Sequence, residues 1–396
     1  MEFAKLLLLF TLISIVPGQI VRVPIFQTVT VTVSDIAVTL CVFFSSIYLL
    51  FFKRSLKLKA NIIIPAFIFS LIAFASTVLA LQNFSKSEVA TAALFLIRFL
   101  LYFAISVITF NLIEKQDVKK WINGLLLVIT VFVFLGFFQL IAFPDLTFLT
   151  QFGWDPHLTR ITSTFLDPNF AGGLMSISFA LSLAFYTREK KFILLLVSGI
   201  IFIAAILTFS RSTYLAFLTV LATIGILKSP RLLLAFLGIF LIAFFSVPQV
   251  KTRVAGALSV DETAQARLES WEKAIVIFQK NPVFGVGFNT YRYAQEKEGF
   301  FSIDDPLGGH SGAGSDSSVL LVAATTGTIG LFAFIYFLFA QVLTFAKGAR
   351  RNALHLGALS AFLSLIVHSQ FVNSLFFPQI MLVLWFILGL VNSYDS

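Results

Sequence analysis

The feature that most constrains this chain is a series of apolar runs, each about as long as the hydrocarbon core of a bilayer. A helix needs about 20 consecutive apolar residues to cross that core, and only helices or closed barrels satisfy their backbone hydrogen bonds there. We count twelve such runs, separated by short charged breaks. They cover residues 4–18, 33–52, 61–82, 89–113, 121–143, 169–186, 191–208, 211–227, 231–248, 316–345, 352–370 and 375–392. The pattern predicts an all-α, polytopic membrane protein with about 12 transmembrane helices.

The composition fits this class and argues against several others. Of the 396 residues, 58% are hydrophobic and only 12% are charged, whereas a soluble domain carries about 25% charged residues. The single cysteine, Cys41, lies inside an apolar run, so no disulfide framework is expected. We also expect no bound metal or nucleotide, because the sequence has no clustered carboxylates, no Walker A loop and no H-E-x-x-H pair.

The net charge of +9 does not indicate a nucleic-acid partner, because the basic residues follow the pattern of a membrane protein. Most of them lie in alternate short loops, at 53–59, 115–120, 188–191, 228–231 and 347–351. Cytoplasmic loops carry such an excess of Lys and Arg. The pattern therefore places both termini in the cytoplasm, and the stretches 144–169 and 249–315 on the outer side.

The first apolar run is short enough to be a secretory signal peptide. However, MEFAK is only weakly basic, and IVPGQIVR has no small-x-small cleavage site. We therefore expect a retained helix and a single integral-membrane domain over 1–396. Within it, 249–315 forms one large external loop that carries much of the site.

An amphipathic helix is expected in this external loop, over 262–280. Arg267, Trp271, Ala274 and Phe278 follow the spacing of one helix face. Arg267 has no carboxylate three or four residues further on, so its guanidinium group suits phosphate binding. The alternative is a helix that rests on lipid headgroups, with Arg267 at its margin.

Glycines follow this helix in the segment NPVFGVGFNTY. Pro282 ends the helix because proline cannot continue it, and Gly285 and Gly287 come next. Two interpretations are open: a nest of backbone N–H groups that binds phosphate, or a tight turn that packs against the helix. A G-x-G pair alone is weak evidence for a phosphate nest, so the tight turn is favoured.

Two more arginines lie at external ends of predicted spans. Arg160 precedes the sixth run, and Arg211 stands between the seventh and eighth. Basic residues on the outer side run against the usual orientation bias. Each either reaches for lipid phosphates at the interface or joins Arg267 in binding an anionic substrate. Arg253 is a weaker candidate, since Asp261 is within reach.

Candidate catalytic bases lie near the end of the external loop. His310 belongs to the segment GGHSGAG, and Asp316 stands at the predicted start of the tenth span. A histidine titrates near neutral pH and can take a proton from a hydroxyl group. The alternatives are a solvated loop histidine and a helix-capping carboxylate. His157 has no evident partner, and His368 is expected to be peripheral.

Three sequence blocks resemble the O-antigen ligase and O-antigen polymerase superfamily of bacterial membrane glycosyltransferases. They are TSTFLDPNFAGG (162–173), LTFSRSTYLAF (207–217) and ARLESWEKAIVIFQKNPVFGVGFNTY (266–291), and TTGTIG (325–330) follows them. The resemblance implies transfer of a glycan from an undecaprenyl-diphosphate carrier to an acceptor hydroxyl, at the outer face of the bacterial inner membrane. It implies that this transfer needs no cofactor and that Arg211 and Arg267 hold the diphosphate. Arg160 is a further candidate by position.

The chain departs from the ligase pattern at one place. Ligases of this superfamily typically carry a His-Asn pair about eleven residues before the glycine that matches Gly327. Here that register falls on Asp316-Ser317, and Thr325 replaces a common Glu. Either Asp316 replaces the base, or His310 reaches the same place. The acceptor remains open between a glycan, a lipid and a protein, as does the choice between ligase and polymerase.

A lipid-glycan transporter is the alternative from a different class. Transporters tend to place charged residues mid-membrane and to show two paired halves with broken helices. In this sequence only Arg98 lies clearly within a span, with Tyr102 one turn further on, and the two halves are dissimilar. The sequence therefore favours the glycosyltransferase.

Overall fold

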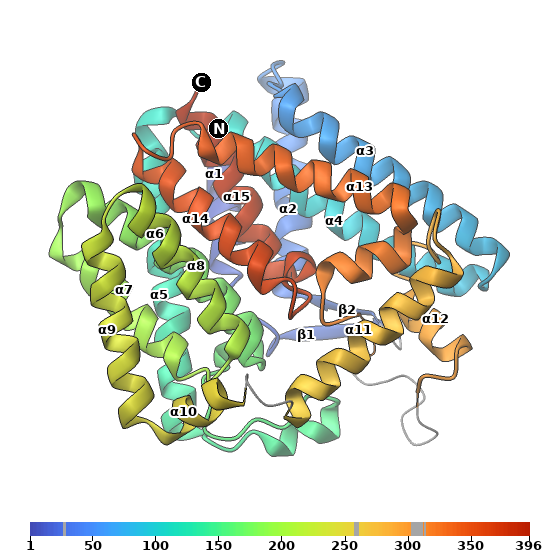
Figure 1. Cartoon of the computed structure of the whole chain (residues 1–396). Coiled ribbons are helices and arrows are strands. Elements are labelled where there is room, and N and C mark those ends of the chain that lie inside the picture. The colour runs from blue at the N-terminus through green and yellow to red at the C-terminus, as the bar shows by residue number, and fades with distance from the viewer. Residues whose placement is uncertain (27–28, 257–260, 302–311, 313) are drawn as a thin grey trace.

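The computed structural model describes residues 1–26, 29–256, 261–301, 312 and 314–396, and this part of the chain is mostly helical (Figure 1). The α-helices are α1 (Glu2–Ile13), α2 (Val33–Ile47), α3 (Ala60–Leu79), α4 (Lys86–Leu112), α5 (Val118–Ala142), α6 (Pro168–Glu189), α7 (Phe192–Ile206), α8 (Arg211–Leu227), α9 (Pro230–Ser246), α10 (Pro248–Ala255), α11 (Glu262–Lys280), α12 (Tyr291–Lys297), α13 (Ser318–Ala346), α14 (Ala353–His368) and α15 (Pro378–Tyr394). Short helical turns are η1 (Tyr48–Phe52), η2 (Ala80–Gln82), η3 (Lys115–Asp117), η4 (Thr147–Phe152), η5 (Ser163–Phe165) and η7 (Ser374–Phe376). Two strands, β1 (Arg22–Phe26) and β2 (Val29–Thr32), form a hairpin.

The predicted all-α membrane architecture is confirmed, and each of the twelve predicted runs contains a helix. Within the described residues, six helices are long and apolar enough to cross a membrane by length and composition. A seventh results if α9 and α10, which meet at an angle of 100°, count as one span. The helices α7, α8, α14 and α15 are apolar but shorter, at 15 to 17 residues.

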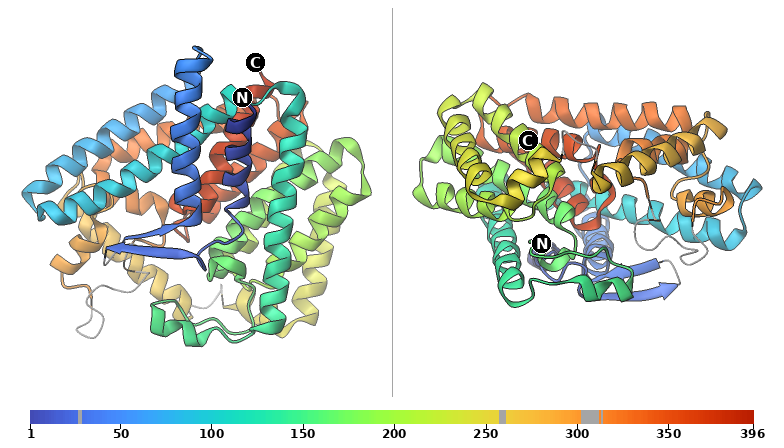
Figure 2. Two further views of the ribbon diagram at one scale, coloured as in Figure 1. Left: turned by 180° about the vertical axis from the view of Figure 1, so that it is seen from behind. Right: turned by 60° about the horizontal axis from the view of Figure 1, so that its bottom comes forward.

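The centre of the bundle is built from α6, α14 and α15, whose side chains are almost all buried. Helix α6 packs along α14 and also contacts α7 and α8. Small residues permit this close approach: a Cβ atom placed at Gly357 of α14 would lie 3.0 Å from a methyl carbon of Leu181. The two chain termini lie together at one end of the bundle, and α10, α11 and the hairpin lie at the opposite end (Figures 1 and 2).

The β-hairpin is an element that the apolar-run pattern did not predict. Its strands pair antiparallel, with Arg22 opposite Thr32 and Val23 opposite Val31. Contacts at the start of β1 and at the end of β2 hold the hairpin in place. The Arg22 guanidinium lies 4.6 Å from the ring centroid of Trp154, and Thr32 forms a capping box with Asp35 at the start of α2.

Arg98, the charge within the fourth predicted span, is an ion-pair residue. Its Nε lies 2.9 Å from Oδ1 of Asp35, and its Nη2 donates to Oδ2 of the same carboxylate at 3.1 Å. The Tyr102 hydroxyl donates to Asp35 as well, at 3.0 Å. A buried charge needs such a partner, so Arg98 ties α4 to α2 and the hairpin.

A kink in α13 explains the glycine-rich segment after α11. Gly327 interrupts the helix with φ 67° and ψ −168°, a backbone conformation that is essentially restricted to glycine. The interrupted backbone groups bond to the segment 282–287 instead. These bonds run from Val286 N to Ala324 O (3.0 Å), from Gly287 N to Thr325 O (2.9 Å) and from Thr328 N to Pro282 O (2.8 Å). The segment is therefore a tight turn clamped onto α13, and these loop N–H groups are not free to bind phosphate.

We expect Gly327→Ala to destabilise the protein by about 2–5 kcal/mol, through backbone strain and overpacking. A Cβ atom at this position would lie 2.2 Å from the carbonyl oxygen of Val283. Thermal unfolding in detergent, followed by tryptophan fluorescence, measures the effect. Gly199→Ala is the matched control, because a Cβ there meets nothing within 4 Å. Equal melting temperatures for the two variants would show that the kink is not needed.

Candidate active site

The candidate site lies at the end of the bundle opposite the chain termini, where four chain segments meet (Figure 1). They are the starts of α6 and α8, the helix α11, and the residues that lead into α13. Hydrogen bonds join them in pairs. Ser210 donates to the Asn169 side chain at 2.7 Å, and Asp316 N donates to Ser270 Oγ at 2.9 Å. A further bond, from Ser318 N to Ser369 O at 2.8 Å, anchors the start of α13 to the residue that follows α14.

Arg211 is the first residue of α8, and its guanidinium group bridges to the segment between α10 and α11. Nη1 donates to the Gly256 carbonyl and Nη2 to Oδ1 of Asp261, both at 2.8 Å. The Arg211 side chain is only 12% exposed, whereas that of Asp261 is 33% exposed. Burial tends to raise the pKa of Asp261, but hydrogen bonds from Arg211 and from the Ala264 N–H outweigh it and hold that pKa below its usual value.

Arg267 lies on α11, six residues beyond Asp261. Within the described part of the chain, no hydrogen bond or ion pair satisfies its guanidinium group. Burial lowers its pKa, the carboxylate of Asp316 opposes that shift, and Arg211 adds to it. Arg267 is therefore a half-buried cation within electrostatic reach of Arg211 and Asp316.

The predicted apolar face of α11 packs against the protein. Ala274 and Ile277 are buried, and α11 lies along α13. Trp271 contacts Phe371, with 5.8 Å between ring centroids. The apolar face of α11 is therefore supported by packing against α13 and Phe371.

Arg160 bonds to the turn that precedes Arg211 and α8. Its Nε donates to Thr208 O at 2.8 Å and its Nη2 to Phe209 O at 3.3 Å. Burial lowers its pKa to about 10, and Arg253 contributes to the shift. The structure thus groups Arg160, Arg253 and Arg267 with Arg211, and the two bonds of Arg160 help to place the start of α8.

One interpretation of Asp316 was that it caps α13, and the structure shows that it does not. The N-cap is Ser317, whose hydroxyl accepts from Leu320 N, and the helix begins at Ser318. The start of the apolar run marked the helix end to within two residues, and both Asp and Ser make good caps. Among the described residues, no donor bonds to the Asp316 carboxylate. Burial raises its pKa to about 6, against the opposing effect of Arg267.

The four histidines have different environments. His310 lies outside the described residues. His157 is buried, and burial with nearby Arg160 lowers its pKa to about 4. His368, the residue expected to be peripheral, is fully buried at the end of α14. A Cβ atom at Gly173 of α6 would lie 3.2 Å from its ring. His355 bonds to Asp395 at the C-terminal end and takes no part in the site.

Asp167 is a site residue that the sequence analysis did not single out. It caps α6, because its Oδ1 accepts from Asn169 N at 2.7 Å and from Phe170 N at 2.9 Å. Burial raises its pKa, while Arg160 and Arg267 oppose the shift. An Asp before a proline-initiated helix is a recognisable cap signature, and that signal marks the position.

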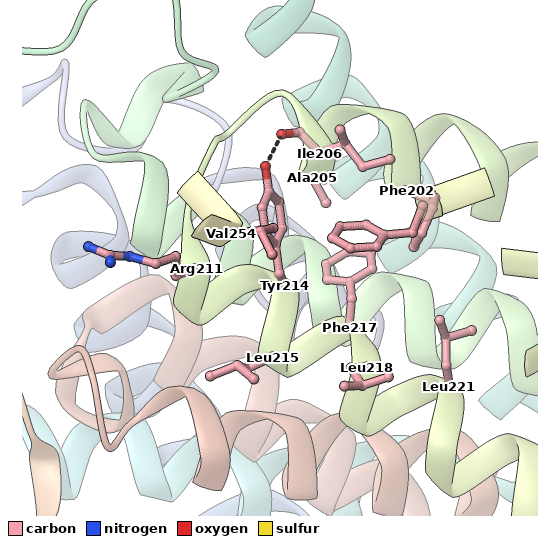
Figure 3. Close-up of a pocket in the computed structure, with 11 residues that line it drawn as sticks. Phe202, Ala205, Ile206, Arg211, Tyr214, Leu215, Phe217, Leu218, Leu221 and Val254 are labelled. Carbon is pink, nitrogen blue, oxygen red and sulfur yellow. Dashed lines mark hydrogen bonds between the residues drawn. The ribbon is translucent and has the colours of Figure 1, made fainter. Parts of the chain in front are cut away.

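An apolar pocket of about 300 Å³ opens next to Arg211, between α7, α8, α9 and the end of α10 (Figure 3). Arg211 stands at one edge, with its guanidinium group directed away from the rings of Phe202 and Phe217 (Figure 3). Tyr214 closes this side by donating to Ile206 O at 2.8 Å. The pocket therefore combines an apolar interior with a cation at its rim.

Comparison with known families agrees with this arrangement. The sequence model described as O-antigen ligase matches residues 194–335. No curated protein sequence matches the chain. The matched segment includes the second and third blocks of the resemblance, with Arg211, Arg267 and Asp316, while the first block at 162–173 lies before it. Residues 194–335 of this chain are therefore similar to the O-antigen ligase family.

Proposed function

We propose that the protein is a membrane glycosyltransferase that moves a glycan from undecaprenyl diphosphate to an acceptor hydroxyl, as an O-antigen ligase does. The observation that carries this proposal is Arg267, a half-buried guanidinium without a bonded partner among the described residues, within electrostatic reach of Arg211 and Asp316. We place this site at the outer face of the bacterial inner membrane and both termini in the cytoplasm, in line with the distribution of basic loops.

The diphosphate is held by arginines in this proposal. A guanidinium group presents two parallel N–H donors, which match two oxygens of a phosphate. Arg211 and Arg267 supply these donors, and the nearby Arg160 adds positive charge. Binding does not require a metal ion, because several guanidinium groups together neutralise the diphosphate.

The lipid part of the donor fits the apolar pocket beside Arg211. Ligand pockets have volumes of about 300–1,000 Å³, so the pocket of about 300 Å³ holds only the part of a long polyprenyl chain nearest the diphosphate. The remainder lies in the bilayer, because pocket residues such as Leu215 and Leu218 are open to the surface.

The transfer step makes one bond and breaks one. The acceptor oxygen attacks the anomeric carbon, and the bond from this carbon to the diphosphate oxygen breaks. The electron pair leaves with the undecaprenyl diphosphate, whose growing negative charge the arginines stabilise. The hydroxyl proton passes to a base, which is Asp316 or His310 in this proposal. A pKa near 6 leaves Asp316 largely ionised at neutral pH and still basic enough to take a proton.

The test is transfer from a lipid-linked oligosaccharide to an acceptor by the purified protein in proteoliposomes. One glycan added per acceptor indicates a ligase, whereas a ladder of repeat units indicates a polymerase. Movement of the lipid-linked glycan across the bilayer without a new glycosidic bond would contradict the proposal and support a transporter.

The pocket makes its own prediction, tested with Leu218→Trp. The added ring fills part of the pocket, so we expect the KM for a long-chain polyprenyl donor to rise about five- to tenfold. The value for a short-chain donor should stay unchanged, because its lipid does not reach this residue. Leu241→Trp is the control: Leu241 is 53% exposed on the neighbouring α9, similar to 45% for Leu218, and does not line the pocket. Equal KM values for both variants with both donors would show that the lipid does not bind in this pocket.

A further inference from the structure

We propose that Asp261 is a placeholder for the donor diphosphate: its carboxylate occupies Arg211 before the donor binds and gives way to a phosphate group. This inference rests on the proposed function, because it assigns the diphosphate to Arg211. It adds a residue that regulates access to that cation.

The two terminal nitrogens of Arg211 each bond to an oxygen atom, one of a backbone carbonyl and one of a carboxylate. Arg211 directs both terminal nitrogens at oxygen atoms of one short segment, the carbonyl of Gly256 and the carboxylate of Asp261, each at 2.8 Å. A phosphate group presents two oxygens to a guanidinium in a similar way. A carboxylate carries one negative charge, whereas a diphosphate carries more, so the diphosphate is the stronger partner for the same two nitrogens.

The two side chains differ in their exposure to solvent. Arg211 is 12% exposed and Asp261 33% exposed, so the carboxylate is the outer member of the pair. Asp261 also caps α11 through the Ala264 N–H at 2.8 Å. The same oxygen, Oδ1, accepts this bond and the bond from Arg211. A phosphate group that takes over the Arg211 donor therefore ends the ion pair and leaves the Ala264 N–H to hold the carboxylate at the helix cap.

The helix that Asp261 begins connects the placeholder to the rest of the site. Arg267 lies six residues along α11, which is about 9 Å at 1.5 Å per residue. Ser270, three residues further on, accepts from the Asp316 backbone N–H at 2.9 Å. Release of Asp261 thus acts on the helix that carries Arg267 and supports the segment with the candidate base.

The test is the Kd of inorganic pyrophosphate for the purified full-length protein in detergent, measured by titration calorimetry. Asp261→Asn removes the charge and keeps the cap, since Asn and Asp are equally good N-caps. We expect Asp261→Asn to bind pyrophosphate about three- to tenfold more tightly, the range of a partly exposed ion pair. Glu262→Gln is the matched control: it removes the same charge from the exposed neighbouring residue and should change the Kd less than twofold.

The opposite result has a clear meaning. If Asp261 instead holds Arg211 permanently in its binding position, Asp261→Asn will bind pyrophosphate more weakly than the wild type. An unchanged or increased Kd therefore overturns the placeholder. Arg211→Ala separates this failure from that of the proposed function. Wild-type binding that depends on Arg211 supports the diphosphate site even if the placeholder fails, whereas binding that is absent from both the wild type and Asp261→Asn contradicts both.

A spin label provides a second measurement that does not depend on affinity. The only native cysteine, Cys41, is buried, so a Cys41→Ala, Glu262→Cys chain takes one label beside Asp261. We expect pyrophosphate to increase the mobility of the label in the wild-type background. With Asp261→Asn the label should be mobile from the start. A label that responds to pyrophosphate in neither background would show that this helix end stays in place, and would contradict the placeholder.

Discussion

Replacing Arg211 and Arg267 together with alanine is expected to lower kcat/KM for glycan transfer by at least about 10³-fold. Removing a single donor to the developing charge of a transition state typically costs about 10²–10³-fold. Both arginines act on one leaving group, so their effects are coupled and the double variant need not equal the product of the single ones. The measurement is the initial rate of transfer in proteoliposomes at matched protein content.

The control for this double variant keeps the same change in net charge. Lys251 and Lys297 are exposed basic residues of the stretch 249–315, and their double alanine variant should retain most activity. The conservative double variant with lysine at 211 and 267 keeps both charges but loses the paired donors, so it should be intermediate. Full activity of the double alanine variant would eliminate the proposed roles of Arg211 and Arg267.

Asp316→Asn is expected to reduce kcat by about 10²–10⁴-fold, the usual contribution of a positioned general base. The pH dependence gives the sharper test. Burial raises the pKa of Asp316 to about 6, and only the ionised carboxylate accepts a proton. The wild-type rate should therefore rise with pH up to about 6 and level off above it, and this acid limb should disappear in Asp316→Asn.

His310 offers a direct contrast to this expectation. If His310 is the base, Asp316→Asn keeps both its rate and the acid limb, and His310→Ala loses them. Thermal unfolding of each variant separates loss of chemistry from loss of fold. An Asp316→Asn protein that is folded, fully active and unchanged in its pH profile would exclude the carboxylate as the base.

The sequence predicted the features that depend on local pattern. The apolar runs located the helices of the bundle, and helix spacing with Pro282 predicted α11 with the bounds that the structure shows, 262–280. The orientation bias of basic residues singled out Arg160 and Arg211 as unusual, and the structure groups both with Arg267. These predictions were possible because each depends on residues that lie close together in the sequence.

Other features depend on contacts between distant segments, which a single sequence does not reveal. The role of Gly285 and Gly287 became clear only with the kink at Gly327, about forty residues away. The ion pair between Arg211 and Asp261 joins residues fifty positions apart. The pocket beside Arg211 is lined by residues of four helices. The β-hairpin was missed because its short strands directly precede the much stronger apolar signal of the next span.

The right-angle bend between α9 and α10 has a consequence for how substrates arrive. Pro248 begins α10, and the 100° turn directs the chain from a path along the bundle to one across the end opposite the termini (Figure 1). Arg253 and Asp261 thereby lie beside Arg211 at the end of the helices. For the proposed reaction, the donor then meets its cations by lateral diffusion within its own leaflet and never needs extraction into water. Turnover should consequently follow the surface density of the donor in the membrane and not its bulk concentration.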